Sequence, residues 1–149
     1  MPFKIIEDNI LKLEVIAIVN FDNDKVEMKD GIAHQLYLEA GGIDLTAAIK
    51  KHFPLNKGDI FTTPAYRLNA KQFIHVVIDN ENINNKQKFI KDTLLSLLNY
   101  VTNNNIKSIA IPFTNDSYLY QYHEYLDSDI IPTINNFLKI YNIEVYLVK

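Results

Sequence analysis

The sequence contains no cysteine among its 149 residues and only four glycines. Without cysteine there is no disulfide framework, no thiolate nucleophile and no zinc site built on thiolates. No apolar run approaches the roughly 20 residues that a membrane-spanning helix requires. Lys and Arg number 15 against 18 Asp and Glu, a net charge of -3, which argues against nucleic acid as a partner. We therefore expect a cytoplasmic protein without a membrane partner.

What the sequence does contain is typical of a globular protein. Hydrophobic residues make up 48% of the chain and charged residues 22%. A chain of this length can bury about two-thirds of its unfolded surface in a single core. We therefore expect one domain over residues 1–149.

Apolar runs with strand character alternate with segments of helical periodicity. This alternation predicts an α/β domain with three layers, α/β/α. The predicted strands are 3–6, 15–19, 59–63, 72–78, 108–112 and 144–148. The predicted helices are 31–40, a second one that begins after Gly42 and stops at Pro54, 86–101, and a last one near 130–141. Polar residues at 79–85 predict a loop.

The stretch 15–42 is the first place to look for function. An apolar strand at 15–19 runs into a polar loop and then into a helix, for which Asp30 is the expected N-cap. Asp44 or Thr46 is the expected cap of the next helix, and residues 127–129 offer the cap of the last one. In α/β proteins, strand, loop and helix N-terminus together bind ligands at the carboxyl end of a sheet.

Several segments in the right order resemble the macro domain, the ADP-ribose-binding module. The family's strand Ala-Ile-Val-Asn-Ala-Ala-Asn matches residues 17–23, and its Ser-Ile-Ala-Phe-Pro strand matches 108–112. Residues 8–11, 39–41 and 62–77 match further family segments. The resemblance covers essentially the whole chain and implies a macro-domain-like fold with a central mixed sheet.

The resemblance also implies a ligand, ADP-ribose or a related nucleotide, and in similar domains hydrolysis of ADP-ribose derivatives. The family position that faces the distal ribose and serves catalysis matches Asn23, with Asp22 or Asp30 as a candidate base. No cofactor is implied. The ligand-binding residues carried over are Asp8, Asn9, Ile10, Phe21, Asp22, Asn23, Gly31, Ile32, Ala33, Thr114, Asn115, Ser117 and Tyr118.

The two phosphate-binding loops differ from the family pattern. The triple glycine of the first loop is reduced to Gly31, and residues 114–121, which match the second loop, contain no glycine. Glycines in such loops allow a close approach to phosphate oxygens. The alternative function is therefore a macro-fold interaction module that has lost ADP-ribose binding and contacts a protein through its tyrosine-rich rim, Tyr118, Tyr120, Tyr122 and Tyr125.

The tyrosines have two interpretations, a stacking surface for the ligand or a surface for a protein partner. His75 lies in an apolar strand and is expected to be a core histidine with a satisfied ring nitrogen. Asn20 is expected to tie the loop together through backbone hydrogen bonds. The histidines form no recognisable ligand set, so no metal is predicted.

Overall fold

The computed structural model describes residues 3–78 and 83–149, so the predicted loop at 79–85 lies partly outside the described residues. It contains a six-stranded sheet in the order β1-β6-β5-β2-β4-β3. All neighbouring strands are parallel except β3 and β4, which are antiparallel. The strands are β1 (Phe3–Ile6), β2 (Ala17–Asp22), β3 (Ile60–Pro64), β4 (Gln72–Val77), β5 (Ser108–Pro112) and β6 (Glu144–Val148).

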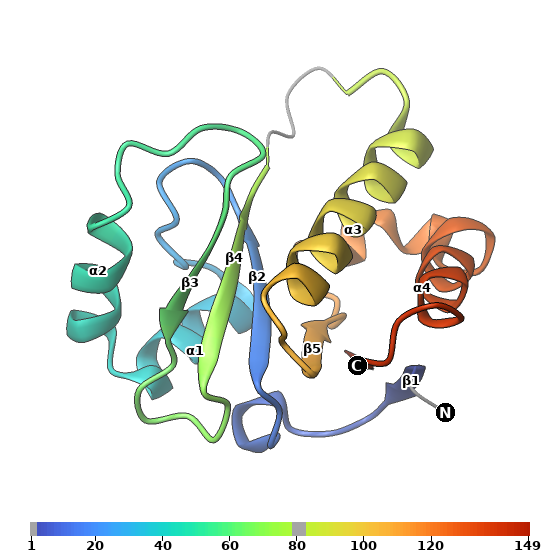
Figure 1. Cartoon of the computed structure of the whole chain (residues 1–149). Helices are drawn as coiled ribbons and strands as arrows, with labels where there is room; N and C mark the ends of the chain where they lie inside the picture. The colour runs from blue at the N-terminus through green and yellow to red at the C-terminus, as the bar shows by residue number, and fades with distance from the viewer. Residues whose placement is uncertain (1–2, 79–82) are drawn as a thin grey trace.

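Helices cover both faces of this mixed sheet, which confirms the three-layer α/β/α prediction (Figure 1). The α-helices are α1 (Gly31–Ala40), α2 (Gly42–Lys50), α3 (Lys86–Asn103) and α4 (Ile131–Leu138). Shorter helical segments are the 3-10 turns η1 (Ile10–Lys12) and η2 (Leu119–Tyr125) and the π-helical segment η3 (Leu126–Ile130). No helix among the described residues is long and apolar enough to cross a membrane.

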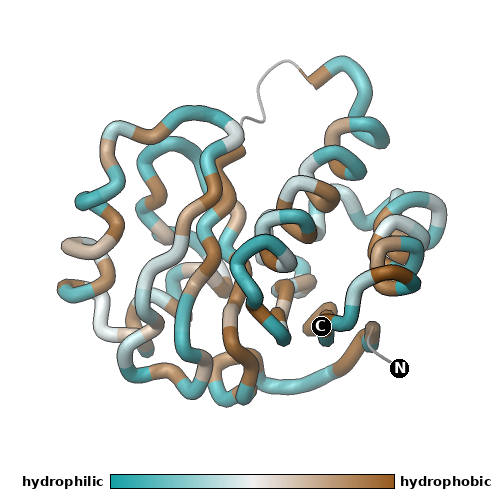
Figure 2. The backbone as a smooth tube through the Cα atoms, viewed as in Figure 1, coloured by the Kyte–Doolittle hydropathy of each residue, from teal (hydrophilic) through white to brown (hydrophobic). Residues whose placement is uncertain are grey.

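The core lies in two halves, one on each face of the sheet. Alternate residues of a strand point to opposite faces, so Val19 and Phe21 of β2 pack with α3 and α4, whereas Ile18 packs with α1 and α2. Figure 2 shows hydrophobic segments in the central strands and alternating hydropathy around the helices. The same alternation places the even-numbered polar residues of β2 on the α1 side.

Strand β2 differs from its prediction in a way that matters for the site. It starts at Ala17 and continues to Asp22, although the apolar run ends at Val19. Its pairing with the parallel strand β4 extends to Asp22 and Val77, so hydrogen bonding to β4 continues β2 past the apolar run. Asn20 and Asp22 are therefore strand residues and not loop residues.

Two of the three predicted helix caps are wrong. Asp30 is the N-cap residue of α1, as predicted, although its side chain makes no cap hydrogen bond. Gly41, with a φ of 99°, separates α1 from α2, so α2 starts at Gly42 and Asp44 lies in its first turn. Residues 127–129 belong to η3, which leads directly into α4. Within η3, the Asp129 carboxylate accepts hydrogen bonds from Gln87 Nε2 (2.9 Å) and Ser128 Oγ (2.7 Å), and Ile130 is the residue at the N-cap of α4.

Candidate ligand-binding cleft

A cleft of about 230 Å³ lies at the carboxyl ends of the adjacent parallel strands β2 and β5. The end of β2, the segment 27–33 that enters α1, and the segment 116–119 after β5 form its walls. Its lining residues are Val19, Asn20, Phe21, Asp22, Asn23, Glu27, Met28, Lys29, Asp30, Ile32, Ala33, Leu36, Pro112, Asp116, Ser117, Tyr118 and Leu119. This edge of an open α/β sheet is the usual position of ligands.

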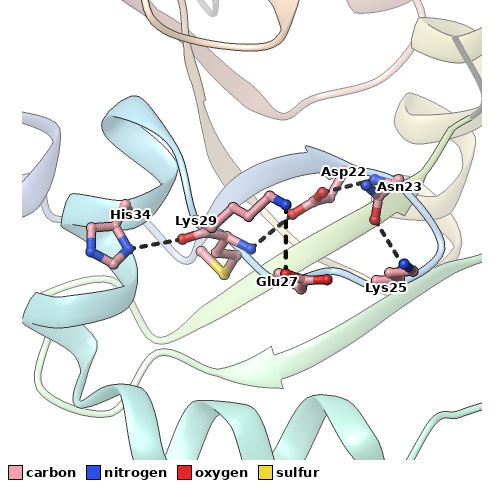
Figure 3. A network of polar contacts seen from close by, with 7 residues as sticks. Asp22, Asn23, Lys25, Glu27, Lys29 and His34 are labelled. Carbon is pink, nitrogen blue, oxygen red and sulfur yellow. Dashed lines mark hydrogen bonds and ion pairs between the residues drawn. The ribbon is translucent and has the colours of Figure 1, made fainter.

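The Asp22 carboxylate organises the first wall of the cleft. Asn23 N donates to Asp22 Oδ1 (2.8 Å), and Met28 N donates to Asp22 Oδ2 (3.1 Å). Figure 3 shows Asp22 next to Asn23 in this polar network. Burial raises the pKa of the Asp22 carboxyl, and the backbone hydrogen bonds from Asn23 and Met28 oppose that rise. The carboxylate thus holds both ends of the loop that follows β2.

A buried hydrogen-bonded chain supports Asp22 from the sheet. The Asn20 side chain hydrogen-bonds to Asp22, and its Nδ2 donates to His75 Nδ1 (3.1 Å). His75 Nε2 in turn lies 2.8 Å from Thr63 Oγ1. The strand register brings these residues together, since Asn20 is paired with His75 on β4, and β3 lies on the far side of β4.

His75 is fully buried, and burial, with a smaller contribution from nearby His52, lowers its pKa to about 3. The ring is therefore neutral at pH 7. Because Nδ1 accepts from Asn20, the proton lies on Nε2 and is donated to Thr63. The prediction of a core histidine with satisfied nitrogens is confirmed. The prediction that Asn20 binds the loop backbone is wrong, because its amide is oriented toward His75 and Asp22.

The loop between β2 and α1 is fixed by its own residues as well. Val26 and Met28 are buried, yet both have positive φ values, 44° and 50°. Such values are strained for side chains other than glycine and persist when surrounding contacts impose them. Asn23 Oδ1 accepts from Lys25 N (2.9 Å), which forms an Asx turn, and His34 Nδ1 of α1 donates to the Met28 carbonyl (3.2 Å).

The two loops that correspond to the family's phosphate loops touch each other. Gly31, with a φ of 56°, packs so closely on Asp116 that an added Cβ would lie 2.9 Å from the Asp116 Cβ and would collide with its backbone oxygen. The 114–117 turn is closed by Ser117 N and Ser117 Oγ, which both donate to the Thr114 carbonyl (2.9 and 2.7 Å). A glycine is therefore required at position 31 for contact between the loops.

Carboxylates dominate the charge of the cleft. Asp22, Glu27, Asp30 and Asp116 line it, against a single lysine, Lys29. Lys29 Nζ lies 3.8 Å from Glu27 Oε2, so part of its charge is already compensated (Figure 3). The cleft is therefore a net acidic environment.

Aromatic rings form the wall on the other side. The Phe21 and Tyr118 rings stack with their centroids 6.1 Å apart, and Tyr118 is 6.2 Å from Tyr122. Tyr122 is only 2% exposed and belongs to the core, and Tyr120 and Tyr125 are half-buried against it. The predicted tyrosine-rich rim thus faces largely inward, with Tyr118 directed to the cleft.

The structure brings about half of the predicted site residues together. Those that line the cleft are Phe21, Asp22, Asn23, Ile32, Ala33, Ser117 and Tyr118. Gly31 and Thr114 are not lining residues; Gly31 packs on Asp116 in the contact between the loops, and the Thr114 carbonyl closes its own turn by accepting from Ser117. Asp8, Asn9, Ile10 and Asn115 are not among the lining residues; Asn9 Oδ1 caps η1 through Leu11 N (3.0 Å), and Ile10 is buried. Their ligand-binding role stays a prediction.

Residues outside the predicted set of ligand-binding residues also shape the site, Asn20 and Asp116 among them. Asn20 lines the cleft and connects it to His75, and Asp116 closes the second loop onto Gly31. The pairing of 17–22 with 72–77 contained a signal for the first, because two buried polar residues on neighbouring strands must satisfy each other. Among the described residues, no group of three or more His, Asp or Glu side chains could hold a metal ion.

The chain is similar to two archaeal proteins that are 30% identical to it in sequence. One is an uncharacterized protein of Sulfurisphaera tokodaii, 30% identical over 115 residues, which are 75% of this chain and 63% of that protein. The other is an uncharacterized protein of Saccharolobus solfataricus, 30% identical over 111 residues, which are 72% of this chain and 62% of that protein. The chain thus covers less than two-thirds of the length of either relative.

Solved structures share the fold at lower identity. The Oceanobacillus iheyensis macrodomain with ADP has a TM-score of 0.81 at 22% identity, covering 98% of this chain and 81% of that one. The Trypanosoma brucei macrodomain in complex with ADP-ribose has a TM-score of 0.74 at 15% identity, covering 99% and 63%. The family model of the macro domain matches residues 19–116, which include most of β2, the loop that follows it and the start of the loop after β5. The chain belongs to the macro domain family.

Proposed function

We propose that the chain binds ADP-ribose or a related nucleotide in the cleft at the carboxyl ends of β2 and β5. The observation that carries the proposal is the cleft itself, because the strand, loop and helix that the resemblance matches to the family's binding site form its walls. The structural neighbours solved with ADP and with ADP-ribose support the same ligand class.

Asn23 is the residue that we assign to the ribose of the ligand. Its Oδ1 is used in the Asx turn with Lys25 N, and among the described residues nothing binds its Nδ2. An amide nitrogen with two free N–H donors suits a ribose hydroxyl. The stacked rings of Phe21 and Tyr118 supply an apolar wall beside it.

The proposal is limited to binding. A hydrolytic step would need a base, and the candidates are Asp22 and Asp30.

Calorimetric titration of the purified chain with ADP-ribose, and with adenosine as its nucleoside fragment, tests the proposal. We expect a dissociation constant between micromolar and millimolar, which corresponds to about -8 to -4 kcal/mol. Asn23→Ala removes both the turn acceptor and the amide donor, whereas Asn23→Ser keeps an oxygen for Lys25 N and loses the amide N–H groups. Both variants should weaken binding about tenfold, the value of one good hydrogen bond.

The matched control is Asn135→Ala, which removes an exposed amide on α4, outside the cleft lining. It should bind as the unchanged chain does. If no heat is seen with either ligand up to millimolar concentration, the nucleotide proposal is wrong. The alternative of an interaction module that has lost ligand binding would then be the one to pursue.

A further inference from the structure

We propose that the cleft selects the uncharged ribose of a nucleoside over its phosphates, and that the Asp22 carboxylate determines this specificity. The inference rests on the proposed function, since it concerns the ligand of the same cleft. It goes further because it names the part of a nucleotide that the cleft accepts and the side chain that rejects the rest. Three observations support it.

The first observation is that two backbone donors of the loop that follows β2 are already occupied. Phosphate binding in loops of this kind relies on free backbone N–H groups that point at the anion. Here the N–H groups of Asn23 and Met28 donate to the two oxygens of Asp22. A phosphate would have to displace a carboxylate that is also held from behind by Asn20.

The second observation is the charge balance of the lining. Four carboxylates face one ammonium group, and the ammonium of Lys29 is shared with Glu27. A diphosphate would bring two further negative charges into this environment, where each close like-charge pair is unfavourable. A nucleoside brings none.

The third observation is the space available. The cleft encloses about 230 Å³, whereas pockets that enclose drug-sized ligands have volumes of about 300–1,000 Å³. The contact of Gly31 with Asp116 also closes the gap between the two loops that the resemblance matches to the family's phosphate loops. The enclosed space is therefore small for the part of a ligand that carries a diphosphate.

The carboxylate also has a positive role. Dinucleotide-binding folds use an acidic side chain to accept the hydroxyl hydrogens of a ribose. Asp22 lies at the equivalent edge of this sheet, beside the free Nδ2 of Asn23. Asp22 offers an acceptor and Asn23 a donor to a sugar diol. The hydrogen bonds that connect Asn20, His75 and Thr63 hold the Asp22 carboxylate in place.

The test is a titration series with adenosine, AMP, ADP and ADP-ribose against the unchanged chain and three variants. Asp22→Asn keeps the shape, frees one backbone N–H and removes the charge. Glu27→Gln removes a charge from the same cleft, at a side chain that binds no backbone amide of the loop. Asp92→Asn removes a charge from an exposed position on α3, outside the cleft lining.

In the unchanged chain, affinity should fall from adenosine to ADP by about tenfold or more, the effect of one to two like-charge contacts. Asp22→Asn should weaken the binding of adenosine and strengthen the binding of ADP, so that the order of the two affinities reverses. Glu27→Gln should improve ADP by a smaller factor and leave adenosine unchanged. Asp92→Asn should change neither.

A second measurement does not depend on any variant. Raising the salt concentration screens charge repulsion, so ADP should bind the unchanged chain more tightly at high salt while adenosine is unaffected. If ADP-ribose or ADP binds the unchanged chain as tightly as adenosine and Asp22→Asn leaves that order intact, the selectivity for ribose is refuted and nucleotide binding stands. If no member of the series binds, both proposals fall.

Discussion

Replacing His75 by Asn should change how the stability of the protein depends on pH. His75 must be neutral in the folded protein, because its Nδ1 accepts from Asn20 and burial holds its pKa at about 3. In the unfolded chain its pKa returns to about 6.5. Between these two values the unfolded chain binds a proton that the folded protein does not, so stability is full above pH 6.5 and is lost as the pH falls.

The magnitude follows from the two pKa values. At pH 4.5 the solution is two units below the unfolded pKa and still above the folded one, so protonation of the unfolded chain costs about 3 kcal/mol of stability. The variant lacks this cost. At pH 7.5, however, the variant should be less stable than the unchanged protein by about 2–4 kcal/mol, because it loses packing and the hydrogen bond to Thr63.

Urea unfolding of both proteins at pH 7.5 and pH 4.5 measures the prediction. The stability difference of about 2–4 kcal/mol at pH 7.5 should shrink to about 1 kcal/mol or less, or change sign, at pH 4.5. Asp22, whose pKa burial raises, contributes with the opposite sign, but it is present in both proteins and cancels in the difference. His123→Asn controls for loss of an exposed histidine. An equal difference at the two pH values would refute the reasoning.

Three further predictions concern stability at pH 7.5, each measured by urea unfolding. Gly31→Ala should lower the free energy of unfolding more than Gly58→Ala, because both glycines have a positive φ but only Gly31 has a backbone neighbour where the Cβ would go. The difference between the two variants should exceed about 1 kcal/mol. Equal losses would contradict the contact between the loops. Thr63→Val should cost about 1–3 kcal/mol by leaving His75 Nε2 without an acceptor, whereas Thr63→Ser, which keeps the hydroxyl, should cost less. Asn85→Ala should cost about 1 kcal/mol by removing the α3 cap on Lys88 N (3.1 Å), and Asn85→Asp, which keeps the acceptor, should be close to neutral.

Local pattern predicted most of the elements well. Strands β1, β5 and β6 and helix α1 have the predicted bounds. Each of these elements is bounded by signals in its own residues: apolar runs between polar segments for the strands, and Gly41 after the end of α1. The core position of His75 was predictable for the same reason. Its neighbours on β4 are apolar, so its ring is buried and must find its hydrogen-bond partners inside the protein.

The polar contacts of the site could not be read from local pattern. Asn20 meets His75 only because β2 and β4, 55 positions apart, pair in one particular register. The path of the 23–30 loop depends on Asp22 binding Met28 N and on Val26 adopting a positive φ, which its side chain disfavours. The predicted caps of α2 and α4 were wrong because α2 starts directly after a left-handed glycine and because η3 precedes α4 without a break.

Backbone amide NMR spectra recorded during a titration with adenosine test most directly where the ligand binds. The account predicts that the amide signals of 20–33 and 116–119 shift together, with Asn23 and Met28 among the largest changes, because their N–H groups bind the carboxylate that meets the ribose. Shifts centred on the hollow between β3, β4 and α3, which Ile60, Val76 and Phe89 help to line, would contradict the account. So would a spectrum unchanged at millimolar adenosine.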